Sequence, residues 1–190
     1  MFAVLRIPSS RLLSGTVVAS LLFASCPVYT FANIDNTYDV KIGPNIGSAE
    51  DMGTSVSAGD INGDGYDDVV VGADAYNSHT GRVYVYYGSA SGISSTPNLT
   101  LNGQNAGEDF GYAVAAAGDV NHDGYDDVVV GADRYNSYIG RVYLYYGGSS
   151  GLSSTPAVTL DGETGNDRFG FAVGSDGDVN GDGYDDVVVG

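Results

Sequence analysis

The sequence predicts an all-β fold, a β-propeller built from four-stranded blades, and three observations support this prediction. A 14-residue segment that begins at Gly59 recurs at Gly118 and at Gly177, so the repeat period is 59 residues. Each full copy contains four short apolar runs bounded by Gly, Asn, Asp, Ser or Pro, as strands usually are. Outside the N-terminus, no window carries a helical stripe of apolar residues. Four strands in a repeat of this length are typical of a propeller blade.

The strands of a blade are placed most clearly in the second copy of the repeat. They are expected at 110–117, 127–131, 141–146 and 157–160. The three valines of 128–130 are consecutive, which indicates a strand covered on both faces. The residues of 141–146 alternate in part, so neighbouring side chains of that strand should point to opposite faces of the sheet.

The chain divides into an N-terminal leader, a short linker and the repeats. Residues 1–32 contain no acid, and Arg6 and Arg11 precede an apolar stretch of about 13 residues that is too short to span a bilayer comfortably. This pattern predicts a signal peptide cleaved near Ala32, with an uncleaved anchor as the alternative. Residues 22–26 loosely resemble a bacterial lipobox, which would attach a lipid to Cys26. The further boundaries are 33–41 for the linker, 42–100 for the first blade, 101–159 for the second and 160–190 for part of a third.

The repeats amount to about 2.5 blades. Gly190 corresponds to Gly72 and Gly131, which lie in the middle of their units. Propellers typically close with four to eight blades, and single repeat units cannot bury their own apolar faces. We therefore expect an incomplete propeller, with the remaining blades beyond Gly190.

The charge balance excludes several classes of partner. The chain has 24 acidic and 7 basic residues, a net charge of −17. From Asn33 onward the 24 acids face only 5 bases, so the net charge is −19. Such a chain repels phosphate, which argues against nucleic-acid binding and against an anionic membrane surface. No integral membrane span is expected in the mature chain.

Each repeat contains a nine-residue loop with oxygen ligands at its odd positions. In the first copy, Asp60, Asn62, Asp64 and Asp68 offer side-chain oxygens, and Tyr66 offers its backbone carbonyl. The same positions hold Asp119, Asn121, Asp123, Tyr125 and Asp127 in the second copy, and Asp178, Asn180, Asp182, Tyr184 and Asp186 in the third. A glycine at position 6 allows the chain to wrap around an ion. This all-oxygen set suits Ca²⁺, whereas Zn²⁺ prefers Cys or His.

The residues of the loops allow two other interpretations. Asp, Asn and Gly are ordinary turn residues, so a metal-free Asx turn is one alternative. An EF-hand is the other, but its loop needs a Glu at position 12, where this chain has Val71. We expect calcium to have a structural role here, because its binding would relieve carboxylate repulsion and contribute to folding.

The order of these motifs resembles that of FG-GAP repeats. Phe110-Gly111, the nine-residue loop and the segment 128–132 follow one another as in that family, and the resemblance covers about residues 42–190. It implies a seven-bladed propeller like that of integrin α subunits, with calcium bound by the loop ligands at its bottom. The chain departs from the motif at Met52, which replaces Phe, and at Asp74 and Asp133, which replace Pro.

Other reactive side chains give no catalytic site. His79 and His122 are interpreted as exposed loop residues, since neither recurs in the other repeats. Asp67, Asp126 and Asp185 occupy position 8 of the loops and are interpreted as solvated charges facing away from the ion. We therefore predict no catalytic residue and no enzyme activity.

The resemblance and the leader together imply a secreted or cell-surface protein. The function expected is that of a non-catalytic, calcium-stabilised module for adhesion or for binding an extracellular protein or glycan. The alternative is the non-catalytic propeller module of a larger secreted hydrolase or lyase. Asn98 begins a glycosylation sequon, which would be used only in a host that glycosylates secreted proteins.

Overall fold

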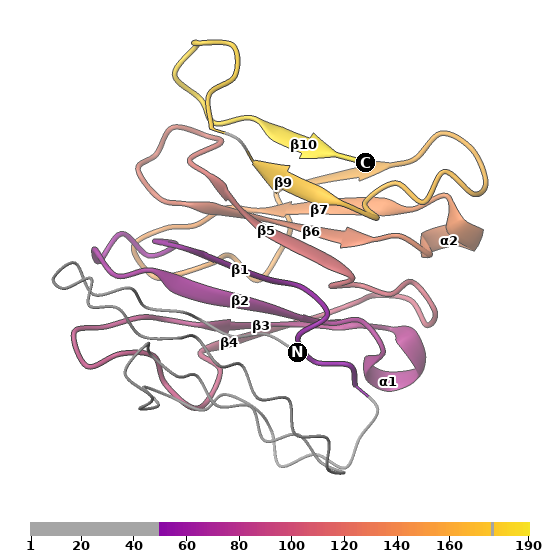
Figure 1. Ribbon diagram of the computed structural model, residues 1–190, viewed down its shortest axis with the longest axis horizontal. Helices are drawn as coiled ribbons and strands as arrows, with labels where there is room; N and C mark the ends of the chain where they lie inside the picture. The colour runs from indigo at the N-terminus through magenta and orange to yellow at the C-terminus, as the bar shows by residue number, and fades with distance from the viewer. Residues whose placement is uncertain (1–49, 176) are drawn as a thin grey trace, which may run out of the picture.

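A computed structural model describes residues 50–175 and 177–190 of the chain (Figure 1). The predicted signal peptide at 1–32, the lipid-attachment residue Cys26 and the linker at 33–41 lie outside the described residues. The described part is built from antiparallel sheets joined by loops, which confirms the all-β prediction. None of the helices in this part has the length and apolar character needed to cross a membrane.

Two four-stranded sheets and one two-stranded sheet form the molecule. The strands of the first sheet are β1 (Val56–Gly59), β2 (Asp68–Ala73), β3 (Arg82–Tyr86) and β4 (Leu99–Asn102). Those of the second are β5 (Ala113–Gly118), β6 (Asp127–Ala132), β7 (Arg141–Tyr145) and β8 (Val158–Asp161). The third pairs β9 (Val173–Ser175) with β10 (Val187–Val189). Strands follow chain order in both large sheets, which is the arrangement of propeller blades.

The strand registers repeat from one sheet to the next. Val71 pairs with Tyr84 between β2 and β3, and Val130 pairs with Tyr143 between β6 and β7. Both pairs are related by the 59-residue period of the sequence. The period is therefore a structural repeat, and each copy of it builds one sheet.

Each Phe-Gly pair forms a turn rather than the start of a strand. The strand predicted from Phe110 begins at Ala113, because Gly111 has a φ of 88°, which is incompatible with extended backbone. Phe110 instead forms an isolated parallel bridge with Gly81 of the preceding sheet. Its ring is buried and meets Tyr143 edge to face, with 5.2 Å between ring centroids. The turn therefore fixes one sheet onto its neighbour.

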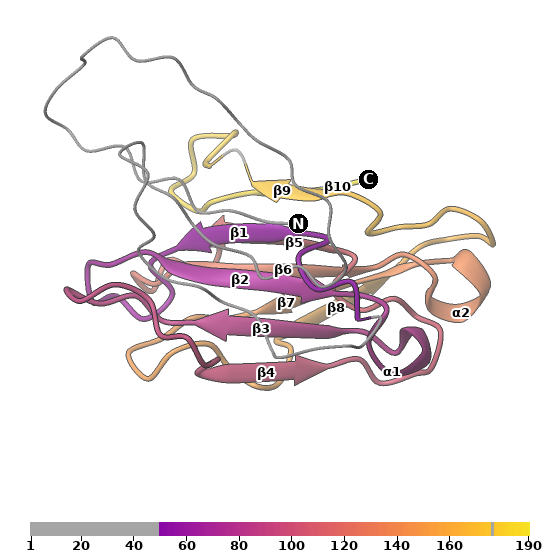
Figure 2. The ribbon, with the colours of Figure 1, turned by 60° about the horizontal axis from the view of Figure 1, so that its bottom comes forward.

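The sheets stack face to face (Figure 2). Apolar side chains fill the layers between them. Between the first two sheets, Val70 and Val85 pack in one cluster with Val114 and Val128. A separate cluster around Val129 joins the second sheet to the third. The strands β2 and β6 are buried along their whole length, as the continuous valine runs predicted. Burial of this apolar surface is the main force that holds the sheets together.

The sheets approach most closely at two glycines. A Cβ atom on Gly72 would lie 2.0 Å from the carbonyl oxygen of Gly111, and one on Gly131 would lie 2.0 Å from that of Gly170. Real Cβ atoms do not come so near to a backbone oxygen. Only glycine permits this spacing of adjacent sheets.

Two single turns connect the second and third strands of the large sheets. These are α1 (Tyr76–His79) and α2 (Tyr135–Tyr138), of four residues each. Their central residues have left-handed backbone angles, such as φ 47° and ψ 64° at Asn77. The sequence carries no helical stripe there, and left-handed backbone is unfavourable by about 1–2 kcal/mol for each non-glycine residue.

Candidate metal centres

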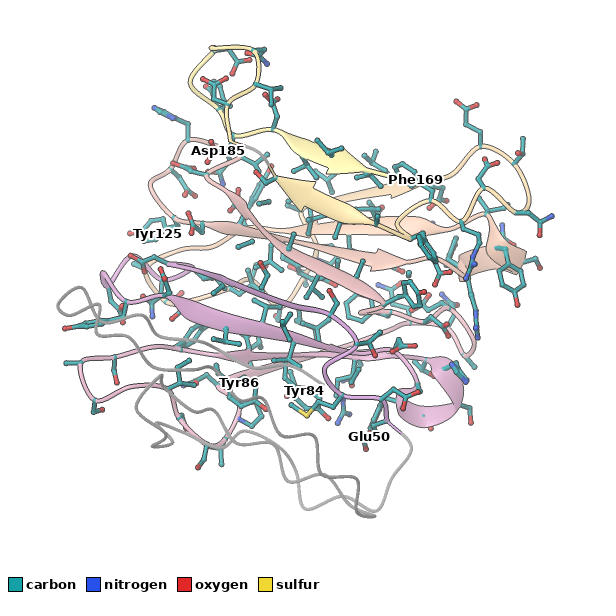
Figure 3. The ribbon with its side chains drawn as sticks, in the orientation of Figure 1. Glu50, Tyr84, Tyr86, Tyr125, Phe169 and Asp185 are labelled. Carbon is teal, nitrogen blue, oxygen red and sulfur yellow. The ribbon has the colours of Figure 1, made fainter. Side chains whose placement is uncertain are left out.

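The three nine-residue loops lie at one end of the stacked sheets. They join β1 to β2, β5 to β6 and β9 to β10, so antiparallel topology places them together. Figure 3 labels Tyr125 and Asp185 at this end, and Phe169 at the opposite end near α2. The molecule thus has a loop end and a turn end, and each end brings together residues from successive repeats.

The first three side-chain ligands of each loop converge. In the first loop, the backbone nitrogen of Asp64 donates to Oδ1 of Asp60 at 3.0 Å and to Oδ1 of Asn62 at 2.9 Å. The amide Nδ2 of Asn62 donates to Oδ2 of Asp64 at 3.2 Å. The second loop repeats these contacts at 2.8, 3.0 and 2.9 Å. Hydrogen bonds therefore bring the side chains at positions 1, 3 and 5 together, and two of them meet at the backbone nitrogen of position 5.

The glycine at position 6 closes the loop, as predicted. Gly65 has a φ of 86°, and its nitrogen donates to Oδ2 of Asp60 at 2.9 Å. Gly124 and Gly183 make the same contact with the first aspartate of their loops, at 2.7 and 2.8 Å. Side-chain oxygens are thereby held toward the inside of the turn by the backbone itself.

The aspartate at position 9 is held differently. Asp68 is fully buried, and its two carboxylate oxygens accept hydrogen bonds from the nitrogens of Ile61 (3.1 Å) and Gly88 (2.8 Å). Asp127 makes the matching contacts with Val120 and Gly147. Position 9 therefore ties the loop to the end of the third strand, and no hydrogen bond joins it to positions 1, 3 and 5 of its loop.

Burial makes the charged form of these two aspartates unfavourable. It raises the pKa of Asp68 to about 6, although the two backbone amides oppose this, and the charges of Asp64 and Asp60 add to the rise. The pKa of Asp127 is raised to about 6 by the same causes, with Asp123 and Asp119 as the neighbouring charges. A cation at the loop centre would offset this repulsion.

The tyrosines at position 7 lie on the outside of the loops. The side chain of Tyr66 is 44 % exposed, and its backbone nitrogen donates to Oδ1 of Asp64 at 3.0 Å. The ring of Tyr125 covers Gly63 of the preceding loop, where a Cβ would lie only 2.6 Å from it. Tyr184 contacts His122 in the same way, with 5.4 Å between ring centroids.

The donor chemistry of the loops fits a hard divalent cation. At its odd positions each loop offers three carboxylates and one amide oxygen, without nitrogen or sulfur ligands. A carboxylate oxygen has two lone pairs, so one that already accepts an amide proton can still face an ion. Asp186 of the third loop is less enclosed than Asp68, because it accepts one hydrogen bond, from Val179 at 2.9 Å.

The aspartates at position 8 are not simply solvated charges, so that interpretation is wrong for two of the three. Oδ2 of Asp126 accepts a hydrogen bond from the nitrogen of Asp60 at 2.9 Å. Asp185 contacts Asp119 in the same way at 2.8 Å. Asp67 is exposed. One signal in the sequence pointed to this role, since position 8 is Asp in all three copies while position 4 varies between Gly and His.

A second group of ionisable side chains lies at the turn end. Asp74, His79 and Asp109 each have one potential ligand atom within 4.8 Å of the others. His79 is exposed, as predicted, but its Nδ1 lies 3.0 Å from Oδ1 of the buried Asp109. No pattern in the sequence indicates this group, because its members are brought together only by the stacking of two sheets.

Comparison with known proteins agrees with this architecture. The FG-GAP repeat profile matches residues 52–86 and 110–145. Integrin alpha-6 of Gallus gallus is 39 % identical over 149 residues, which are 76 % of this chain and 14 % of the relative. Integrin alpha-5 of Xenopus laevis is 35 % identical over 179 residues (85 % and 17 %), and integrin alpha-IIb of Mus musculus is 38 % identical over 151 residues (73 % and 14 %).

The matched region is a small part of each relative. The chain spans 14 %, 17 % and 14 % of these three integrin chains, so the likeness concerns the repeats and not the whole relatives. Within that region the matched segments cover the first three strands of each four-stranded sheet, β1 to β3 and β5 to β7, and the second segment begins at the Phe-Gly turn. This chain therefore contains FG-GAP repeats and is similar in that region to integrin α chains.

Proposed function

We propose that this protein is a non-catalytic β-propeller module that acts outside the cell, is stabilised by calcium and binds an extracellular protein or glycan. The observation that carries the calcium proposal is the convergence of Asp60, Asn62 and Asp64, which recurs in the second loop. Calcium is favoured because the ligands are all oxygen and the loop has the glycine that such a turn needs.

The ligands of the three ions are those predicted from the sequence. They are Asp60, Asn62, Asp64, Tyr66 and Asp68; Asp119, Asn121, Asp123, Tyr125 and Asp127; and Asp178, Asn180, Asp182, Tyr184 and Asp186. An ion in each loop would join the first two strands of a sheet, so its binding free energy would contribute to folding.

The relationship to integrin α chains supports adhesion or ligand binding as the functional class. The N-terminal pattern at 1–32 supports an extracellular location, where calcium is available to weak sites. The acidic surface, with a net charge of −17 for the chain, also favours a partner that is neither nucleic acid nor an anionic membrane.

A calcium titration of the full chain tests the metal proposal. Calorimetry after removal of divalent ions should show three ions, one for each nine-residue loop, and the melting temperature should rise with calcium. Asp64→Ala and Asp123→Ala should each remove one ion. Asp67→Asn is the matched control, because it removes a charge from the same loop without removing a proposed ligand.

Two results would contradict the proposal. A folded wild-type chain that binds no calcium would make the loops metal-free turns. Retention of every ion by both alanine variants would place calcium elsewhere. The location is tested separately by fractionating the producing cells, since recovery of the protein only in the cytosol would contradict secretion.

A further inference from the structure

We propose that Asp74, His79 and Asp109 form a zinc site at the turn end of the molecule, opposite the calcium loops. The site is independent of the proposed calcium function, because it shares no ligand with the nine-residue loops. Its three members come from separate segments: Asp74 follows β2, His79 ends α1 and Asp109 precedes the Phe-Gly turn of the second sheet.

The geometry brings the right ligand atoms together. One atom from each of the three side chains lies within 4.8 Å of the other two, and Nδ1 of His79 is 3.0 Å from Oδ1 of Asp109. Zinc binds imidazole nitrogen and carboxylate oxygen at about 2.0–2.2 Å, which places tetrahedral ligands ~3.4 Å apart. Small side-chain rotations would therefore complete the site. The mixed nitrogen and oxygen set distinguishes it from the calcium loops.

One buried carboxylate in the group lacks hydrogen bonds that it needs. Asp109 is 1 % exposed, and its Oδ2 accepts no hydrogen bond among the described residues. Nε of Arg134 lies 3.0 Å from this oxygen, so the guanidinium forms an ion pair with Asp109. Nε and Oδ2 nevertheless have no hydrogen-bond partner among the described residues. A buried carboxylate in this state is costly. A bound cation would satisfy Oδ2 directly.

The equivalent positions of the next repeat carry a different set of side chains, although there too one carboxylate oxygen, Oδ1 of Asp133, accepts no hydrogen bond among the described residues. Asp133, Tyr138 and Arg168 stand where the first repeat has Asp74, His79 and Asp109. Arg168 donates to Oδ2 of Asp133 from Nε at 2.9 Å and from its terminal nitrogen at 2.6 Å. The second junction thus pairs an acid with an arginine. The first junction also pairs an acid with an arginine, Asp109 with Arg134, but it adds His79 and Asp74, whose nitrogen and oxygen atoms can bind a metal ion.

Solvent can reach the site. The side chain of His79 is 48 % exposed, and it lines a surface pocket of about 660 Å³ together with Glu108 and Arg134. An ion could enter through this pocket, and water could supply the fourth ligand that three protein ligands leave open.

Zinc titration of the full chain in saturating calcium tests the proposal. Calcium fills the oxygen-ligand loops first, so calorimetry with zinc chloride should then show one zinc ion. Long-range ¹H–¹⁵N NMR spectra resolve the two imidazoles of the chain and should show a shift of His79 but not of His122.

The repeats provide matched variants. His79→Tyr and Asp109→Arg each introduce the residue found at the equivalent position of the second repeat. Each should weaken zinc binding by more than about tenfold, the smallest loss typical even of outer-shell changes. His122→Gly introduces the residue that the other two loops carry and should leave zinc binding unchanged. If Asp109→Arg does not fold, Asp74→Asn replaces it with the same expected loss.

Three results would overturn the zinc site. These are absence of zinc binding by a folded, calcium-loaded chain, unchanged zinc affinity in His79→Tyr, and loss of zinc binding in His122→Gly. Because calcium binding is measured first on the same samples, failure of the zinc site is distinguished from failure of the calcium loops.

Discussion

The Oδ2 atom of Asp126 lies 2.9 Å from the backbone nitrogen of Asp60 and accepts its hydrogen bond. Asp126 belongs to the loop between β5 and β6, whereas Asp60 opens the loop between β1 and β2. Asp185 and Asp119 repeat the contact one sheet later at 2.8 Å. The first and second candidate calcium loops are therefore each positioned by the loop that follows in the sequence.

Removal of this carboxylate should loosen the first two sheets. Asp126→Ala leaves the amide of Asp60 without its acceptor, and hydrogen bonds to charged groups contribute about 1.5–3 kcal/mol. We expect a loss of that size in the free energy of unfolding, measured by urea denaturation in calcium. Asp67→Ala is the matched control, since this residue is exposed and should change stability by less than about 0.5 kcal/mol. Equal losses in the two variants would contradict the role of the contact.

The calcium-free chain should become less stable as the pH rises from about 4 to about 6. The pKa of Asp68 and of Asp127 is about 6 in the folded chain, against an ordinary value of 3.8 in the unfolded chain. Between these values the folded state binds more protons than the unfolded state, so the free energy of unfolding falls with rising pH and levels off above about 6.

Urea denaturation at pH 4.5 and at pH 7 in calcium-free buffer measures this dependence. Asp68→Asn cannot ionise, so it should reduce the difference between the two pH values. Saturating calcium should reduce or reverse it, because the ion favours the ionised carboxylates. The prediction is wrong if, without calcium, the free energy of unfolding of the wild-type chain rises from pH 4.5 to pH 7 by as much as that of Asp68→Asn.

A methyl group at the closest approach of two sheets should be strongly destabilising. In Gly72→Ala the added Cβ would lie 2.0 Å from the carbonyl oxygen of Gly111, so the sheets must separate. We expect a loss of about 3 kcal/mol or more in thermal or urea unfolding. Gly174→Ala serves as the control, because nothing lies within 4 Å of its Cβ position. Similar stability of the two variants would show that the sheets adjust freely.

The hydroxyl of Tyr87 should contribute to the joint between the first two sheets. It accepts a hydrogen bond from the nitrogen of Leu152 at 2.8 Å, across 65 residues of sequence. Tyr87→Phe should therefore cost about 1 kcal/mol. Tyr146 is the equivalent residue of the second repeat and has no such partner among the described residues, so Tyr146→Phe should cost less. The melting temperatures of the two variants measure this difference, and an equal decrease in both would contradict a role for the Tyr87 hydroxyl.

The sequence predicted the sheets well because their determinants are local. The valine runs of β2 and β6, the period of 59 residues and the glycine at position 6 of each loop all have their predicted roles. The predicted start of β5 at Phe110 is wrong. The residue pattern of 110–117 is typical of a strand, but the positive φ of Gly111 makes a turn there. The left-handed turns α1 and α2 carry no sequence pattern that would predict them.

The contacts between repeats could not be predicted in the same way. The sequence predicts a solvated charge at Asp126, because no residue near it in the chain shows that the preceding loop lies against it. The grouping of Asp74, His79 and Asp109 is not predictable from the sequence for the same reason. Such residues depend on how neighbouring sheets stack, which is a property of the assembled molecule and not of any single repeat.

Asp126 lies C-terminal to Asp60 in the chain, and this order matters for folding during synthesis. The ribosome releases the N-terminal sheet first, and the carboxylate that holds its loop follows 66 residues later. The apolar face around Val70 and Val85 remains uncovered during that interval, until β5 and β6 emerge. Each newly synthesised sheet therefore completes its predecessor, and the contacts of a sheet are fulfilled only once its successor has been made.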